Sequence, residues 1–224
     1  MKDVKRIGVV TGVAHELDAL LPDCPRVALG GRPPVARVDW QDKQLFLACA
    51  GIGKVAAATA ATALAARHDV ELLLVIGTAG KIGAADGDLF LLTEAVQADY
   101  GAQRPDGLAH YTAGTMPIGD ATLRCFVGQA PEGLGLPAAR IATSDLFVEC
   151  GVHGARVSDR LDAALIDMET AAVAHAAELL GLPWAAIKAT TDGADTDSAA
   201  SFARNLERAA RAAADAAARL IAGL

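Results

Sequence analysis

Short runs of apolar residues recur along the chain and predict the strands of a buried sheet. The runs are RIGVV at 6–10, VARVDW at 35–40, QLFLACA at 44–50, ELLLVIG at 71–77, DLFLLTEAV at 88–96, RIAT at 140–143, ALIDM at 164–168 and PWAAIKATT at 183–191. Most of them are continuous, as is typical of strands that are covered on both faces. A short polar segment joins VARVDW to the next run, as in a hairpin, so we expect a mixed sheet.

Helical patterns lie between some of these strands. An Ala-rich stretch at 54–68 follows two glycines, and a second at 170–180 is followed by Gly181 and Pro183, which are helix stop signals. The stretch 198–220 places its apolar residues along one helical face. The alternation predicts an α/β protein, and we expect a three-layer α/β/α sandwich around the mixed sheet. The Gly- and Pro-rich stretch 101–136 predicts a long surface excursion.

Length, charge and hydropathy narrow the class of protein. The 224 residues are 53% hydrophobic, which suffices for one core, so we expect a single domain over 1–224. A net charge of −7 without a Lys/Arg cluster argues against nucleic acid and anionic membranes as partners. No apolar run suits a secretory signal or reaches the about 18 residues of a membrane span. We therefore expect a soluble, cytoplasmic protein with reduced cysteines.

Motifs for metal binding or nucleophilic catalysis are incomplete. HELDA at 15–19 lacks the second histidine of a zinc-binding helix, and Cys150 with His153 has no matching second pair of ligands. No GxSxG elbow is present, and GIGK at 51–54 lacks the upstream glycine of a phosphate-binding loop. The sequence therefore predicts neither a metal nor an organic cofactor.

Acidic and small polar residues follow several predicted strands. Glu16 comes after the first strand, Thr78 lies in the predicted turn GTAG, Glu169 directly follows ALIDM, and Asp192 follows PWAAIKATT. Ligands of open α/β sheets bind beyond the carboxyl ends of the strands. Each residue alone is common in a turn or a helix start, but the set together favours a site.

Six segments carry a resemblance to a known family. They are IGVVTGVAHELDALL, AGIGKVAAATAAT, VIGTAGKIG, TSDLFVE, IDMETAAVAHAA and IKATTDGAD, in this order. In these segments the chain resembles the nucleoside phosphorylase/hydrolase superfamily, most closely the 5′-methylthioadenosine/S-adenosylhomocysteine nucleosidases. The resemblance covers nearly the whole chain and implies an α/β/α sandwich that assembles as a homodimer.

The resemblance also implies how an N-glycosidic bond would be cleaved. Asp192 would deliver a proton to N7 of the leaving purine as a general acid. Glu169 would accept hydrogen bonds from the ribose hydroxyls and stabilise the positive charge that develops on the ribose. Met168 would pack against the sugar. Glu16 would orient and deprotonate the attacking water. The expected partner is a small purine nucleoside.

The remaining site residues are also placed by the resemblance. Phe147 would stack on the purine, and backbone groups of Val148 would bind its edge. Thr78 would lie near the attacking water. Ile52 and Phe202 would contact an apolar 5′ group, although Phe202 also begins the apolar stripe of the last helix and suits the core equally well.

Several functions stay open at this stage. Phosphate as the nucleophile would need cationic donors, and neither TGVAHELDA nor LLLVIGTAG contains an arginine, so we expect a hydrolase rather than a phosphorylase. The stretch 98–119 departs from the usual nucleosidase pattern and somewhat resembles futalosine hydrolases. A nucleoside-binding protein without activity is a further alternative, which the presence of all three acids disfavours.

Overall fold

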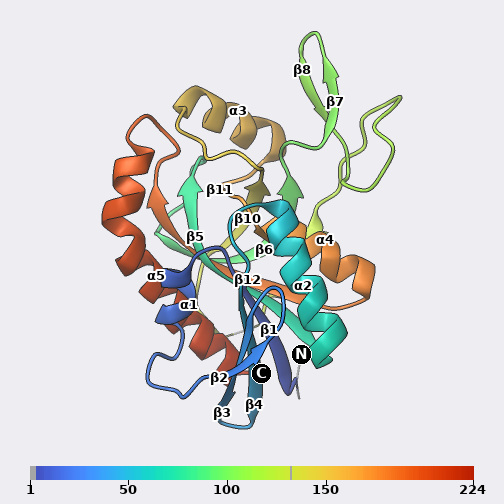
Figure 1. Cartoon of the computed structure of the whole chain (residues 1–224). Coiled ribbons are helices and arrows are strands. Elements are labelled where there is room, and N and C mark those ends of the chain that lie inside the picture. Colours follow the sequence, from blue (N-terminus) through green and yellow to red (C-terminus); the bar gives the residue numbers. More distant parts are fainter. Residues whose placement is uncertain (1–3, 132) are drawn as a thin grey trace.

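The computed structural model describes residues 4–131 and 133–224, in which twelve strands and five helices follow one another (Figure 1). The helices are α1 (Ala14–Ala19), α2 (Lys54–His68), α3 (Gly151–Leu161), α4 (Thr170–Leu180) and α5 (Ser198–Ala222). The strands are β1 (Arg6–Thr11), β2 (Val27–Gly30), β3 (Val35–Trp40), β4 (Lys43–Cys49), β5 (Leu72–Lys81), β6 (Leu89–Gln97), β7 (Gly101–Arg104), β8 (Gly107–His110), β9 (Phe126–Val127), β10 (Ala138–Thr143), β11 (Leu165–Asp167) and β12 (Trp184–Asp192).

Ten of these strands form one mixed sheet, as the sequence predicts. Its order is β11-β10-β6-β12-β5-β1-β4-β3-β2, with β9 paired to β6. β1 runs parallel to β4 and β5, whereas β3 and β4 form the predicted antiparallel hairpin. β11 pairs with β10 and, antiparallel, with β5, so one end of the sheet closes into a ring of five strands.

Helices cover both faces of the sheet and confirm the three-layer α/β/α sandwich (Figure 1). α2 and α4 pack together over one apolar core, while α1 and α5 pack over the other. The helices predicted at 54–68 and 170–180 have these bounds, and α5 extends two residues beyond its prediction. Of the helices described, none is both long and apolar enough to cross a membrane.

The strand directions bring four chain segments to one edge of the sheet. β1, β4, β5 and β12 are parallel to their neighbours in the order β12-β5-β1-β4. Their carboxyl ends therefore lie at the same edge, together with the residues that follow them. This edge holds the start of α1 and the start of α2, and β11 leads directly into α4 nearby.

Three details differ from the sequence predictions. Thr78 lies inside β5 rather than in a turn, because β5 continues to Lys81 through its pairing with β12 and β11. The stretch 101–136 contains the projecting hairpin β7–β8 (Figure 1) and the short strand β9, and it buries Tyr111 and Phe126. α3 had no predicted counterpart; its sequence carries few apolar residues.

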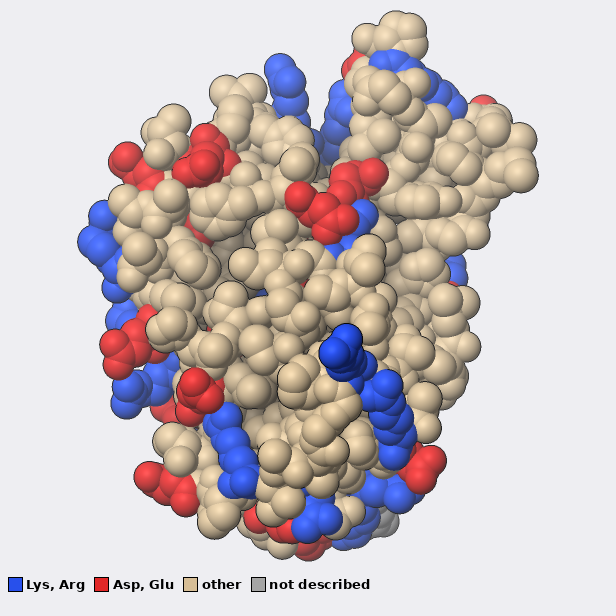
Figure 2. All heavy atoms as spheres, in the orientation of Figure 1, with Lys and Arg blue, Asp and Glu red and all other residues tan. Residues whose placement is uncertain are grey.

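Charges on the visible face of the molecule are mixed. Figure 2 shows Lys/Arg and Asp/Glu side chains scattered over this face, with a broad uncharged area between them. At the lower right of the view several Lys/Arg side chains lie close together, with Asp/Glu side chains beside them.

Candidate active site

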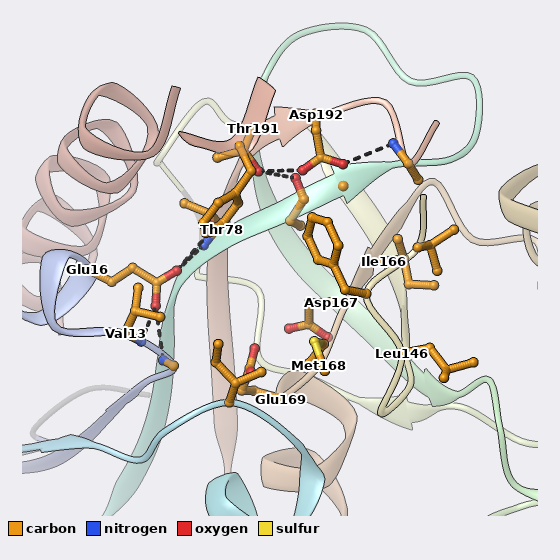
Figure 3. A pocket seen from close by; sticks show the side chains of 18 residues that line it. Val13, Glu16, Thr78, Leu146, Ile166, Asp167, Met168, Glu169, Thr191 and Asp192 are labelled. Carbon is orange, nitrogen blue, oxygen red and sulfur yellow. Dashed lines mark hydrogen bonds between the residues drawn. The ribbon is translucent and has the colours of Figure 1, made fainter. Parts of the chain in front are cut away.

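A pocket of about 300 Å³ lies at the edge of the sheet where the parallel strands end (Figure 3). It draws residues from β5, β11, β12, the starts of α1, α4 and α5, and the loops before α2 and after β10. All nine residues predicted for the site line this one pocket: Glu16, Ile52, Thr78, Phe147, Val148, Met168, Glu169, Asp192 and Phe202. None of the described residues of the stretch 101–136 is among those that line it.

Glu16 lies in the first turn of α1 and is buried, with 4% of its surface exposed. Its Oε2 accepts the backbone N–H groups of Gly12 and Val13 at 3.0 and 3.2 Å. Its Oε1 accepts the backbone N–H and the hydroxyl of Thr78 at 2.8 and 2.9 Å. Four donors suit a carboxylate, which has acceptors only, and they fix the orientation of the group.

Glu169 is the residue that precedes α4, and its side chain is buried beside the pocket. Its Oε1 accepts the backbone N–H of Gly53 at 3.2 Å, and its Oε2 lies 3.8 Å from Nζ of Lys188. Burial raises the pKa of Glu169 to about 7; Lys188 opposes the shift, whereas Asp167 and Glu16 add to it. A carboxyl poised near neutral pH inside a pocket is typical of a functional site.

Asp192 ends β12 on the opposite side of the pocket from Glu169 (Figure 3). Its Oδ1 accepts the backbone N–H of Ala194 at 3.0 Å, and its Oδ2 contacts the hydroxyl of Thr191 at 2.8 Å. The Thr191 hydroxyl also lies 3.4 Å from the carbonyl of Ala79. A hydroxyl both donates and accepts, so this one can serve either protonation state of Asp192.

Each of these three carboxyl groups lies against a glycine. A side chain at any of the three glycines would meet the carboxyl group at a distance shorter than ordinary contact. The pairs, with the distance from an added Cβ to the nearest carboxyl atom, are Gly77 with Glu16 at 2.5 Å, Gly12 with Glu169 at 3.2 Å and Gly80 with Asp192 at 3.0 Å. The missing side chains make the space that the acids occupy.

Apolar side chains form the rest of the pocket wall. The rings of Phe147 and Phe202 meet edge to face with centroids 6.0 Å apart. Phe202 therefore lines the pocket rather than the core, which resolves the two roles open from the sequence. Ile52 and Leu146 are exposed at the mouth, and Figure 3 shows Met168 between the acidic side chains. Such a wall suits a flat, partly apolar ligand.

The start of α2 connects two parts of the pocket. The Gly53 N–H binds Glu169, and the next N–H, that of Lys54, donates to Oδ1 of Asp145 at 2.8 Å. The Lys54 ammonium in turn binds Asp99 Oδ1 at 2.6 Å, and Asp99 Oδ2 accepts the Asp145 N–H at 2.9 Å. This network anchors the loop after β10, which carries the aromatic wall, to the same helical turn that holds Glu169.

Sequence reasoning missed two charged residues at the site. Lys188 on β12 is fully buried, and its Nζ lies 3.0 Å from Oδ2 of Asp167, the last residue of β11. Asp167 also accepts the hydroxyl of Thr143 at 2.6 Å and the N–H of Thr170 at 3.0 Å. A signal was present, because a lysine in a continuous apolar run such as PWAAIKATT needs a buried partner.

The chemistry available to this pocket is that of acids. The described residues that line it include four carboxyl groups and neither Lys nor Arg. Among the described residues, no group of three or more His, Cys, Asp or Glu side chains is arranged to hold a metal ion. The arrangement can transfer protons and stabilise positive charge that develops on a bound ligand.

Comparison with known proteins places the chain in a family. The profile of the Phosphorylase superfamily matches residues 6–222. A futalosine hydrolase from Thermus thermophilus is 36% identical over 155 residues, which cover 64% of this chain and 67% of that protein. A 5′-methylthioadenosine/S-adenosylhomocysteine nucleosidase from Actinobacillus succinogenes is 28% identical over 222 residues, which cover 92% and 94%. A nucleosidase of the same name from Helicobacter pylori has the same fold, with a TM-score of 0.83 over 99% of both chains at 23% identity. The chain therefore belongs to the phosphorylase superfamily.

Proposed function

We propose that the chain is a hydrolase that cleaves the N-glycosidic bond of 5′-methylthioadenosine and S-adenosylhomocysteine and releases adenine. The observation that carries the proposal is the meeting of three separately held carboxyl groups, those of Glu16, Glu169 and Asp192, in one largely apolar pocket. The 5′-methylthioadenosine/S-adenosylhomocysteine nucleosidase from Actinobacillus succinogenes matches nearly the whole chain.

The three acids would divide the reaction between them. Asp192 donates a proton to N7 of the purine as the C1′–N9 bond breaks and its electron pair leaves with the base. Glu169 accepts hydrogen bonds from the ribose hydroxyls, and its negative charge stabilises the positive charge that develops on the sugar. Met168 packs against the sugar. Water attacks C1′ while Glu16 takes its proton. The products are the neutral base and a free sugar, and solvent then restores the two acids.

The apolar wall would select the rest of the substrate. Phe147 stacks on the purine, and the backbone of Val148 binds the edge of the base. Thr78 acts through Glu16, whose orientation it fixes. Ile52 and Phe202 contact an apolar group on the 5′ carbon. Cleavage of methylthioadenosine would give the enzyme a role in methionine salvage.

Two alternatives are less well supported. A phosphorylase would bring an anionic nucleophile into a pocket that offers four carboxyl groups and, from the part of the chain that the structure describes, no Lys or Arg. An inactive binding protein would have no need to keep all three acids. Futalosine remains a second candidate substrate, because the Thermus thermophilus futalosine hydrolase is 36% identical to this chain.

The activity test uses a panel of nucleosides. The protein is incubated with methylthioadenosine, S-adenosylhomocysteine, adenosine, inosine and futalosine, with and without phosphate, and the base and sugar products are separated by chromatography. Adenine with free methylthioribose, formed without phosphate, is the expected result. Phosphate-dependent formation of a sugar 1-phosphate would overturn the hydrolase assignment, and exclusive cleavage of futalosine would replace the substrate.

The mechanism is tested with Asp192→Asn, which keeps the shape of the side chain but removes the acid. We expect adenine release to fall about 10²–10⁴-fold. The matched control is Asp195→Asn, because Asp195 is exposed, lies three residues away and does not line the pocket. Undiminished release by the Asp192 variant would exclude it as the general acid.

Three further properties belong to the same proposal. The chain forms a single catalytic domain, supported by one family profile that matches residues 6–222. It acts in the cytoplasm, where its free cysteines stay reduced.

The third property is that the chain assembles as a homodimer, supported by exposed apolar residues near the pocket mouth, among them Ile52 and Val55. Sedimentation of the wild type and of Val55→Asp tests the dimer: we expect twice the monomer mass for the former and a lower mass for the latter.

A further inference from the structure

Lys188 is a buried cation that does not line the pocket. Its side chain is 1% exposed and lies between two carboxyl groups, with Nζ 3.0 Å from Asp167 Oδ2 and 3.8 Å from Glu169 Oε2. Burying an ammonium group is costly unless it is paired. Lys188 is therefore held as a charge, and from its position it reaches the pocket only through its neighbours.

The two carboxylates depend on Lys188 to different degrees. Asp167 already accepts hydrogen bonds from Thr143 and from both the N–H and the hydroxyl of Thr170. Glu169 accepts one hydrogen bond among the described residues, from the N–H of Gly53. Asp167 thus keeps a full set of donors without Lys188, whereas Glu169 would keep one.

The charges around Glu169 make Lys188 decisive for its ionisation. Burial raises the pKa of Glu169, and Asp167 from β11 and Glu16 from α1 raise it further. Against them act the Lys188 charge and the Gly53 N–H at the start of α2. The pKa of Lys188 is lowered by burial but raised on balance by the same three carboxylates, so the lysine stays protonated.

We propose that Lys188 is a positioning residue that keeps the Glu169 carboxylate ionised and turned toward the pocket. There the carboxylate accepts hydrogen bonds from the ribose hydroxyls. The inference rests on the proposed nucleosidase function and extends it to a residue outside the pocket wall. The competing explanation is that Lys188 only stabilises the fold by pairing with Asp167. That explanation predicts lower stability but no change in how activity depends on pH.

The first test is the pH profile of kcat/KM for Lys188→Met, which keeps the length of the side chain without the charge. A unit charge at 3.8 Å is worth about one pH unit even under the screening of bulk water. We expect the acidic limb to move up by at least about one unit. The ionised fraction of Glu169 at pH 7 then falls from about one half to about one tenth, so activity at pH 7 drops about fivefold or more and recovers toward pH 9. Lys188→Arg, which retains the charge, should keep the wild-type limb.

The second test uses the opposite perturbation and does not need the first variant to fold. Asp167→Asn removes the repelling charge and leaves Lys188 in place, so the acidic limb should move to lower pH. In a Glu169→Gln background this limb should be absent. Neither substitution should then change how the residual activity depends on pH, because the group through which they act is gone. Thermal unfolding of each variant separates this effect from a loss of stability.

The outcomes distinguish this inference from the proposed function. A wild type that cleaves no nucleoside overturns the proposed function. An active wild type whose acidic limb stays in place in Lys188→Met, or in Asp167→Asn, overturns the positioning role alone. A shift that persists in the Glu169→Gln background would assign the effect of Lys188 to another group and likewise overturn it.

Discussion

Gly77→Ala offers a sharp test of how Glu16 is held. An added Cβ would lie 2.5 Å from Oε1 of Glu16, whereas ordinary contact begins at 3.4 Å. The carboxylate must therefore retreat by about 0.9 Å. This movement stretches the two hydrogen bonds from Thr78, which join the same oxygen at 2.8 and 2.9 Å.

The expected loss follows from that displacement. Misplacing a catalytic group by about 1 Å costs on the order of 10²-fold in rate, or about 2.7 kcal/mol of transition-state stabilisation. The added methyl group should also lower the free energy of unfolding by about 1–3 kcal/mol, and the backbone φ of +158° at Gly77, which L side chains rarely adopt, adds to this loss. This is less than the roughly 5–15 kcal/mol that holds an ordinary domain folded, so the variant should fold.

The assay compares kcat/KM for adenine release from methylthioadenosine with the temperature of unfolding. Gly151→Ala is the control for an added methyl group without a close contact, because an added Cβ there meets only Cβ of Asp195, at 3.9 Å. We expect a loss of about 10²-fold for Gly77→Ala and wild-type activity for the control. A Gly77→Ala variant within about threefold of the wild type would refute the link between this contact and the position of Glu16.

Three further predictions concern the same pocket. Thr78→Val removes one donor to the Glu16 carboxylate and should lower kcat about 10–100-fold, whereas Thr78→Ser keeps the hydroxyl and should restore it; steady-state kinetics decide. Phe202→Ala opens the apolar wall and should raise KM for methylthioadenosine about tenfold while changing KM for adenosine little; equal effects on both nucleosides would place the ring away from the 5′ group. Because burial raises the pKa of Glu169 to about 7 and its carboxylate is the active form, kcat/KM should fall about tenfold per unit as the pH drops below about 7; a flat profile from pH 5 to 8 would contradict the role of this acid.

Local patterns predicted most of the secondary structure. The helices at 54–68 and 170–180 have glycines at their boundaries, and both have the predicted bounds. The sequence does not give strand register or order, because these depend on pairing between distant segments. Thr78 illustrates the limit: GTAG has the composition of a turn, but partners on both sides continue the strand through it.

The site was predicted through residues that stand out in the sequence. Glu16, Glu169 and Asp192 are acids at the ends of apolar runs, and their segments also carry the family resemblance. Lys188 and Asp167 were not predicted as a pair, since their importance depends on a distance of 3.0 Å between two strands that a helix separates in the chain and that do not pair in the sheet. The glycines that border the acids were missed for the same reason, because their close contacts arise only in the folded chain.

The first turn of α2 holds both parts of the pocket that the proposed mechanism assigns to a nucleoside, the part for the sugar and the part for the base. One of its N–H groups holds Glu169, which the proposed mechanism assigns to the sugar, and the next holds Asp145, at the root of the loop assigned to the base. Binding of the sugar should therefore also order the loop that contacts the base, and binding of the base should order Glu169. The whole nucleoside should then bind more favourably than the sum of the binding free energies of adenine and of a pentose measured separately. The difference should exceed the gain that comes from linking the two parts, which saves entropy.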